Sequence, residues 1–195
     1  MTQIRVTSLG DEDAIVRVHR EAFGRADEAE LARRLHARGD TCVSLAALAG
    51  DEIVGHVFVS PVSVDGRQFT RTPMGLGPVG VLPDHQRSGA GMALCRAAID
   101  ACRARGTPFL VVLGHPTYYP RFGFVPAMRF ELTFGEMPPR DSFMAMELAP
   151  GVLVGVRGPV RYGPEFSAAF ERDSASSSCR PSRRSRVACP SLNAP

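Results

Sequence analysis

The feature that most constrains the fold of this chain is a succession of strand, glycine-rich turn, helix and second strand between residues 74 and 113. Residues 74–82 have the pattern of a strand, which ends at Pro83. Apolar residues then repeat at helical spacing over 89–105, and the run Phe-Leu-Val-Val-Leu at 109–113 is typical of a strand covered on both faces. This order predicts a βαβ unit with a right-handed crossover and two parallel strands side by side.

The segments on either side of this unit indicate a larger sheet with antiparallel strands. A turn at Gly50-Asp51 between two apolar runs predicts a hairpin. The expected strands cover residues 4–9, 42–49, 52–59, 125–134 and 143–148, and the expected helices cover 11–23 and 27–37. We therefore predict an α/β fold with a mixed, mostly antiparallel central sheet and flanking helices.

Length and composition favour a single domain followed by a tail. A chain of 195 residues, 44% of them hydrophobic, is sufficient for one sizeable core. Regular periodicity extends to about residue 170, whereas the segment after it is rich in Ser, Arg and Pro and has too little apolar surface to order itself. We expect one domain over 1–170 and a disordered tail over 171–195.

The distribution of charged and apolar residues predicts the compartment. Charged residues are spread through the first thirty positions, and no stretch elsewhere is long and apolar enough to cross a bilayer. The five cysteines, at positions 42, 95, 102, 179 and 189, form no C-x-x-C motif, which favours a reduced, cytoplasmic chain without a membrane anchor or a metal site. Cys95 and Cys102 lie on one helix face and are expected to be buried.

The formal charge of +3 arises from the tail. Residues 174–195 contain four arginines and no acidic residue, and without them the chain has 19 basic and 20 acidic residues. The folded part is therefore close to neutral, which argues against a broad nucleic-acid-binding face. A tail that binds RNA or a protein partner is an alternative that rests on these arginines alone.

The segment Gln86–Met92 joins the strand to the best-defined helix and has the features of an anion site. A helix start leaves several N–H groups unpaired and carries the positive end of the peptide dipole. Gly89 and Gly91 remove the side chains that would keep a diphosphate away from those amides, and Arg87 adds positive charge. This turn therefore predicts a phosphate-binding site.

The spacing Gln86-x-x-Gly89-x-Gly91 resembles the [Arg/Gln]-x-x-Gly-x-[Gly/Ala] signature with which GNAT acetyltransferases bind coenzyme A. The preceding Val-x-Val-x-Pro is similar to the family's fourth strand. Residues 114–124 resemble the family's final helix, in which a tyrosine lies four residues before a Gly-Phe pair, and Tyr119 matches that tyrosine. The resemblance covers about residues 3–165 and is greatest to the branch of YhbS-like predicted acetyltransferases.

The resemblance implies a GNAT fold in which 74–82 and 109–113 are the parallel pair, acetyl-CoA as co-substrate, and direct attack by an amine in a ternary complex. It implies that a backbone N–H near Val79–Val81 stabilises the thioester oxyanion and that Tyr119 protonates the departing thiolate, since a phenol with a pKa of about 10 is protonated at neutral pH. Tyr118 is the weaker candidate. The residues expected to bind acetyl-CoA are Val79, Gly80, Val81, Gln86, Arg87, Ser88, Gly89, Ala90, Gly91 and Met92.

Several alternatives stay open at this point. Tyr119 can instead be a packing residue beside the cofactor, and the whole domain can be a sensor that binds acyl-CoA without transferring the acyl group. The general base is not identified; its candidates are His19, His56, His115, Glu21, Glu28 and Glu30. The sequence leaves open the identity of the amine acceptor, the preferred acyl chain and the existence of a homodimer.

One competing motif is rejected on its context. Residues 75–80 match the pattern G-x-G-x-x-G, but they lie within a strand and include Pro78, whereas a dinucleotide-binding turn lies between a strand and a helix. A P-loop is excluded as well, because the chain contains no lysine.

Overall fold

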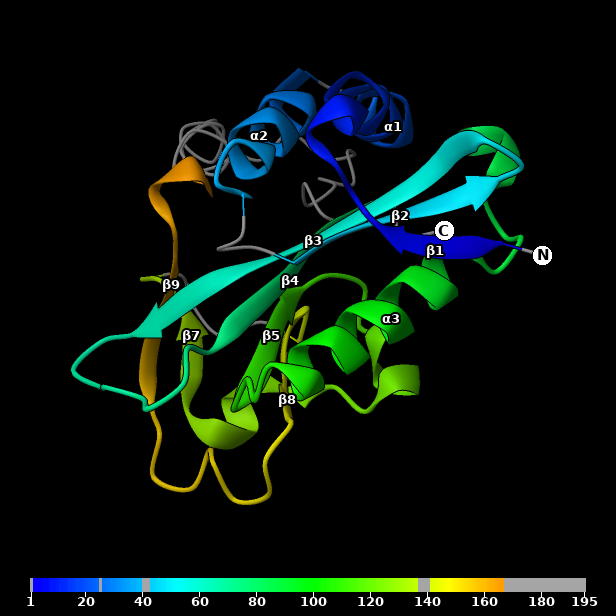
Figure 1. Cartoon of the computed structure of the whole chain (residues 1–195). Helices are drawn as coiled ribbons and strands as arrows, with labels where there is room; N and C mark the ends of the chain where they lie inside the picture. The colour runs from blue at the N-terminus through cyan, green and yellow to red at the C-terminus, as the bar shows by residue number, and fades with distance from the viewer. Residues whose placement is uncertain (1, 25, 40–42, 137–140, 167–195) are drawn as a thin grey trace, which may run out of the picture.

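Helices lie on both faces of a central sheet in the computed structural model, which describes residues 2–24, 26–39, 43–136 and 141–166 (Figure 1). Helices α1 and α2 lie over one face, and α3 lies over the other. The helices are α1 (Glu12–Phe23), α2 (Ala26–His36) and α3 (Ala90–Ala104). The strands are β1 (Gln3–Val6), β2 (Val43–Ala49), β3 (Glu52–Val64), β4 (Met74–Val81), β5 (Phe109–Leu113), β6 (Val125–Pro126), β7 (Leu132–Phe134), β8 (Phe143–Glu147) and β9 (Gly158–Tyr162).

The strand order of the main sheet is β1-β2-β3-β4-β5-β8-β6. Strands β4 and β5 pair in parallel, while β1 to β4 pair antiparallel with one another and β8 pairs antiparallel with both β5 and β6. The predicted mixed sheet and its parallel pair are therefore confirmed. The hairpin at Gly50-Asp51 is also present, with Ala49 opposite Glu52.

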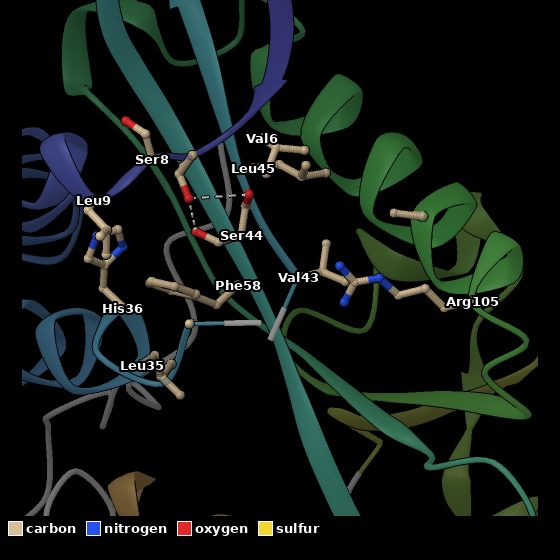
Figure 2. Close-up of a pocket in the computed structure, with 13 residues that line it drawn as sticks. Val6, Ser8, Leu9, Leu35, His36, Val43, Ser44, Leu45, Phe58 and Arg105 are labelled. Atoms are coloured by element: carbon tan, nitrogen blue, oxygen red, sulfur yellow. Dashed lines mark hydrogen bonds between the residues drawn. The ribbon is translucent and has the colours of Figure 1, made fainter. Parts of the chain in front are cut away.

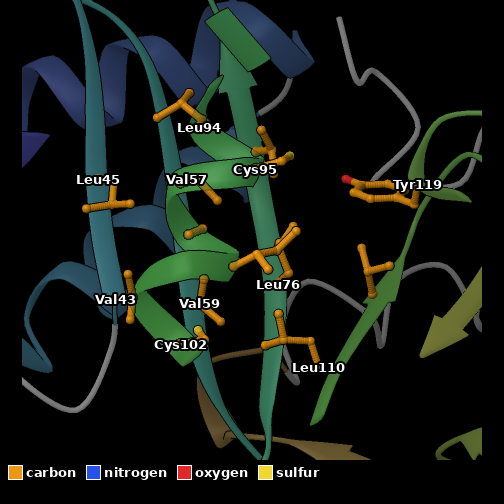
Figure 3. Packing of buried hydrophobic residues seen from close by; sticks show 14 of the residues in the cluster. Val43, Leu45, Val57, Val59, Leu76, Leu94, Cys95, Cys102, Leu110 and Tyr119 are labelled. Carbon is orange, nitrogen blue, oxygen red and sulfur yellow. The ribbon is translucent and has the colours of Figure 1, made fainter. Parts of the chain in front are cut away.

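The sheet separates two layers of core because successive side chains of a strand point to opposite faces. On β3, Val57 and Val59 pack in the cluster that contains α3, whereas Phe58 packs with residues of α1 and α2. Cys95 and Cys102 of α3 are buried with free thiols in the first cluster, as expected (Figure 3). Strand β4 thus lies between a helix on one side and a helix pair on the other.

The expectation for residues 125–134 was wrong, because this segment does not form one antiparallel strand. A 3-10 turn over Ala127–Phe130 separates β6 from β7, and Glu131 then adopts the left-handed region with φ 54°. Strand β7 pairs in parallel with β9, a strand that the sequence pattern did not indicate. Strand β9 also pairs with the far end of β3, which brings Tyr162 opposite Val62.

Two further sequence predictions concern a membrane-spanning helix and a metal site. No helix in the described ranges has the length and apolarity needed to span a membrane. Among the same residues, no group of three or more His, Cys, Asp or Glu side chains could hold a metal ion. The predicted tail at 171–195, the domain end at residue 170 and the cysteines at 42, 179 and 189 lie outside the described residues.

Candidate active site

The glycine turn forms the N-terminus of α3, as the sequence predicted. Gly89 is the residue that caps the helix and has φ 90°, and Arg87 has φ 61°, so the chain passes through the left-handed region twice before the helix begins. The first backbone bond of the helix runs from the N–H of Ala93 to the carbonyl of Gly89. The N–H groups of Gly91 and Met92 consequently have no acceptor within the helix.

Side chains of the turn fasten it to the end of β4. The Ser88 hydroxyl donates to the carbonyl of His85 at 2.6 Å, and the side-chain amide of Gln86 donates to the carbonyl of Val81 at 3.2 Å. The second bond ties the position that begins the Gln-x-x-Gly-x-Gly motif to the last residue of the strand. Gln86 therefore has a positioning contact in addition to any contact with a ligand.

A hollow of about 240 Å³ lies against this helix start. Its lining consists of Arg87, Gly89, Gly91, Met92, Tyr118 and Arg121. The guanidinium of Arg121 lies 4.6 Å from the centre of the Tyr118 ring, and its Nη1 lies 3.7 Å from the sulfur of Met92. Two arginine side chains and the helix N-terminus, whose first amides have no acceptor within the helix, therefore surround one small space. This electrostatic arrangement favours a phosphate group.

The segment that carries the two adjacent tyrosines does not form the expected α-helix. It contains a single 3-10 turn over Tyr119–Phe122, because Pro120 has no N–H to donate and Gly123 turns the chain with φ 100°. This short turn brings Tyr118 to the hollow. Arg121 reaches the same hollow from within the turn.

Tyr119 is 3% exposed and packs in the core cluster on the α3 face of the sheet. Its ring lies against the backbone of Gly114, where an added Cβ would overlap the ring, and 5.8 Å from the ring of Phe124. Figure 3 shows the ring beside β5, with the hydroxyl directed toward β4 and Cys95. The pKa of Tyr119 is held well above 10, mainly by burial and further by the neighbouring Cys95, Tyr118 and Tyr162, so the phenol keeps its proton at neutral pH.

Strand β4 is irregular where it passes this tyrosine. Val79 lies opposite Val57, but Leu76 lies opposite Val59, so Gly77 and Pro78 together face one residue of β3. This is a β-bulge, and it bends the strand. The parallel pairing with β5 comprises only Met74 with Leu110 and Gly75 with Val111. Past the bulge, β4 has no partner strand on its β5 side within the described part of the chain.

The free edge of β4 presents backbone N–H groups. The N–H of Leu82 donates to the carbonyl of Val54 on β3 at 2.8 Å. Because hydrogen-bonding groups alternate between the two edges of a strand, the N–H groups of Val79 and Val81 point to the opposite edge, away from β3. These are the amides that the sequence assigned to the oxyanion, and they point toward the space between β4 and β5.

The two histidines considered as bases lie on the other face of the sheet and are bonded to each other. Nε2 of His19 lies 3.0 Å from Nδ1 of His56, whose Nε2 lies 2.9 Å from the hydroxyl of Ser44. Both side chains are completely buried. Burial lowers the pKa of His19 to about 3 and that of His56 well below 6.5, so both imidazoles are neutral at pH 7.

The remaining base candidates are not brought together. His115 follows β5 and is half-buried, and its carbonyl accepts the N–H of Tyr118 at 3.0 Å. Glu21 and Glu30 are exposed, and Glu30 pairs with Arg33 and Arg34. Glu28 is buried on α2. None of these candidates lines the hollow at the start of α3.

A second cavity, of about 300 Å³, lies between α2, β2 and the segment after β1 (Figure 2). The hydroxyl of Ser44 faces it and accepts a hydrogen bond from Thr7 at 2.6 Å, and His36 and Phe58 line it from the other side. It contains none of the residues expected to bind acetyl-CoA. Four of the expected residues, Arg87, Gly89, Gly91 and Met92, instead line the smaller hollow at the start of α3.

Comparison with known proteins identifies the family. Residues 3–127 match the model of the acetyltransferase (GNAT) domain, and the fold has the mixed sheet and parallel strand pair of that family. The chain therefore belongs to the GNAT family of N-acetyltransferases, as its motifs indicated.

Individual relatives place the chain near one branch of the family. It is 30% identical to the uncharacterized N-acetyltransferase YhbS of Escherichia coli K12 over 167 residues, which are 84% of this chain and 98% of that protein. The crystal structure of E. coli YhbS in complex with CoA superposes with a TM-score of 0.78 at 29% identity, covering 85% of this chain and 92% of that one. A GNAT acetyltransferase of Brucella melitensis in complex with acetyl-CoA gives a TM-score of 0.69 at 29% identity, with 85% and 98% covered.

Sequence reasoning missed Arg121 and gave Tyr118 a lesser place. Both belong to the phrase that resembled the family's final helix, so their presence near the site could have been expected. They line the hollow with Met92 from a 3-10 turn and its cap, where the sequence predicted a helix. The two prolines at 116 and 120 were the available signal.

Proposed function

We propose that this chain transfers an acetyl group from acetyl-CoA to a primary amine by direct attack within a ternary complex. The observation that carries the proposal is the hollow at the start of α3, where Arg87, Arg121 and the amides of Gly91 and Met92 surround a space lined by glycine. The relatives in complex with CoA and with acetyl-CoA support the same ligand. In this proposal the hollow holds the pyrophosphate.

The free edge of β4 then has two tasks. Its N–H groups at Val79 and Val81 can hydrogen-bond carbonyl oxygens, and one of them stabilises the negative charge that develops on the thioester oxygen during attack. The bulge at Gly77–Pro78 keeps this edge from pairing with β5. The pantetheine arm lies along it in the proposed complex.

Tyr119 is the proposed proton donor. The amine nitrogen forms a bond to the acetyl carbon, the carbon–sulfur bond breaks with its electron pair on sulfur, and the thiolate takes the phenolic proton. Burial keeps that proton on Tyr119 at neutral pH until the thiolate forms. The neutral amine gains a positive charge on nitrogen when it attacks and then releases one proton to water, and water returns one proton to the Tyr119 phenolate. No covalent enzyme intermediate is required.

A thiol-release assay tests the proposal. Purified protein is given acetyl-CoA and a panel of primary amines, and free CoA is measured while acetyl-CoA binding is followed by calorimetry. The expected result is binding together with amine-dependent thiol release. Tyr119→Phe should lower kcat about 100-fold, the size typical of losing a general acid, with little change in the Kd of acetyl-CoA.

The other outcomes separate the alternatives. Binding without thiol release from any amine would favour an acyl-CoA sensor, and absence of binding would overturn the identification of the hollow. Arg103→Ala is the control for arginine substitutions at the hollow, because Arg103 also lies on α3 but at its far end, where it pairs with Asp100. Unchanged turnover of Tyr119→Phe at saturating substrates would remove Tyr119 from the mechanism.

A further inference from the structure

Tyr162 lies directly over a glycine of β4, on the face of the sheet opposite Tyr119. A Cβ built on Gly75 would lie 2.8 Å from the Tyr162 hydroxyl oxygen and 2.7 Å from Cζ. The phenol therefore occupies the volume that any side chain at position 75 would need. Its ring is held by Phe166, with centroids 4.8 Å apart, and by Phe134, with centroids 5.6 Å apart.

Gly75 is the point at which β4 and β5 stop pairing. The pair Gly75–Val111 is the second and last of the parallel register, and the bulge at Gly77–Pro78 follows. The Tyr162 hydroxyl thus stands where the two strands begin to separate. Tyr119 approaches the same separation from the α3 face, and the pKa of Tyr119 is raised in part by its proximity to Tyr162, after the effects of burial, Cys95 and Tyr118.

A second hydroxyl lies beside this position. Ser60 of β3 is directly opposite Gly75, and directly opposed residues of an antiparallel pair share a face, with Cβ positions about 4.5–5.5 Å apart. The Ser60 side chain is 3% exposed, and its Oγ has no hydrogen-bond partner among the described residues. A buried hydroxyl is normally satisfied, so this one indicates a missing polar partner.

We propose that the hydroxyls of Tyr162 and Ser60 form the binding site for the acceptor amine, on the sheet face covered by α1 and α2. This inference rests on the proposed acetyl transfer and names the residues that orient its second substrate. Each hydroxyl can accept a hydrogen bond from an amine N–H, and neither carries charge at neutral pH, since burial raises the pKa of Tyr162. They direct the nitrogen lone pair toward the thioester carbon and do not act as the base.

Steady-state kinetics test this site with the amine that gives the fastest thiol release in the wild-type protein. Tyr162→Phe keeps the ring and should lower kcat/KM for the amine about tenfold, the usual effect of losing one hydrogen bond to a substrate, while the Kd of acetyl-CoA is unchanged. Ser60→Ala should have a smaller effect on the same constant. Gly75→Ala should displace the Tyr162 ring and lower the constant at least as much as Tyr162→Phe.

Gly10→Ala is the control for the glycine substitution, because the nearest atom to its added Cβ is 4.0 Å away. Wild-type transfer with an unchanged kcat/KM for the amine in both Tyr162→Phe and Ser60→Ala would overturn this inference and leave the proposed function intact. A wild-type protein that releases no thiol with any amine would overturn the proposed function itself. A loss of acetyl-CoA binding in Tyr162→Phe would also overturn the inference, because the residue would then belong to the cofactor side.

Discussion

The two faces of β4 near its carboxyl end differ in charge and in access to solvent. On the α3 side, Arg87 and Arg121 line an open hollow beside the helix start. On the α1 side, Gly80 lies against His19, whose Nδ1 would be 3.1 Å from an added Cβ, and the imidazole is completely buried. Positive charge on the α3 side therefore comes from exposed guanidinium groups and a helix N-terminus, while the histidines on the α1 side are neutral core residues.

The largest effect that distinguishes the two faces is expected from His56→Ala. The substitution removes a buried ring and both of its hydrogen bonds, to His19 and Ser44, so the free energy of unfolding should fall by about 3 kcal/mol. Acetyl-CoA binding should be unchanged at temperatures where the variant is folded. Chemical denaturation measures the stability and calorimetry measures the binding. A loss of acetyl-CoA binding without loss of stability would show that His56 is not only a core residue.

Removal of Arg87 and Arg121 should weaken acetyl-CoA binding and leave stability nearly unchanged. In the double variant Arg87→Ala/Arg121→Ala, acetyl-CoA affinity should fall about 100-fold, because each charge-assisted contact with a phosphate contributes about tenfold. Stability should change little, since Arg87 is exposed. Calorimetric titration checks the affinity, and an equal loss in Arg103→Ala would show that the effect is only one of net charge.

Acid should destabilise the protein through the histidine face. The pKa of His19 is about 3 in the folded state and about 6.5 in an unfolded chain, so the unfolded state binds more protons as the pH falls below 6.5. The stability contributed by the neutral imidazole is complete above pH 6.5 and should decrease by about 2 kcal/mol on going to pH 5. Denaturation curves at both pH values should show a smaller decrease for His19→Gln, and an identical decrease would exclude His19 as its source.

The smallest expected effect compares Gly89, at the start of α3, with Gly80 of β4. Gly89→Ala places a Cβ where nothing lies within 4 Å but imposes φ 90° on alanine, which should lower stability by about 1 kcal/mol and weaken acetyl-CoA binding. Gly80→Ala has no such backbone strain, but its Cβ meets His19 and Val18 at 3.1 and 3.3 Å. Gly80 was expected from the sequence to bind acetyl-CoA, but its Cβ position faces α1, so the variant should lose stability while binding is retained. Thermal unfolding with and without acetyl-CoA distinguishes the two outcomes.

The sequence predicted the parts of the fold that rest on local signals. The helix over 89–105, the buried strand over 109–113 and the turn at Gln86–Met92 are defined by residues adjacent in the chain, and each is present within about one residue of its expected position. The position of the Gln86–Met92 turn at the start of a helix could be predicted for the same reason. Its placement there needs no information from distant segments.

The parts that could not be predicted depend on tertiary contacts. Strand β9 begins with Gly158 and Pro159, which are poor strand formers, and it is held by pairing with β3 and β7. The contact of Tyr162 with Gly75 joins residues far apart in the sequence and has no local signature. The pairing of His19 with His56 is also invisible in the sequence, which is why both remained open as base candidates.

The bulge in β4 determines which of the later side chains face α3 and which face α1. Leu76 and Val79 are three positions apart, which in a regular strand would place them on opposite faces, yet both belong to the cluster that contains α3. The extra residue at Gly77–Pro78 restores the alternation, and Val81 follows on the same side. If the strand ran regularly at its present length, every later side chain of β4 would change face, bringing valines against His19 and leaving Gly80 against α3. The extra residue of the bulge therefore determines which face each later side chain of β4 occupies.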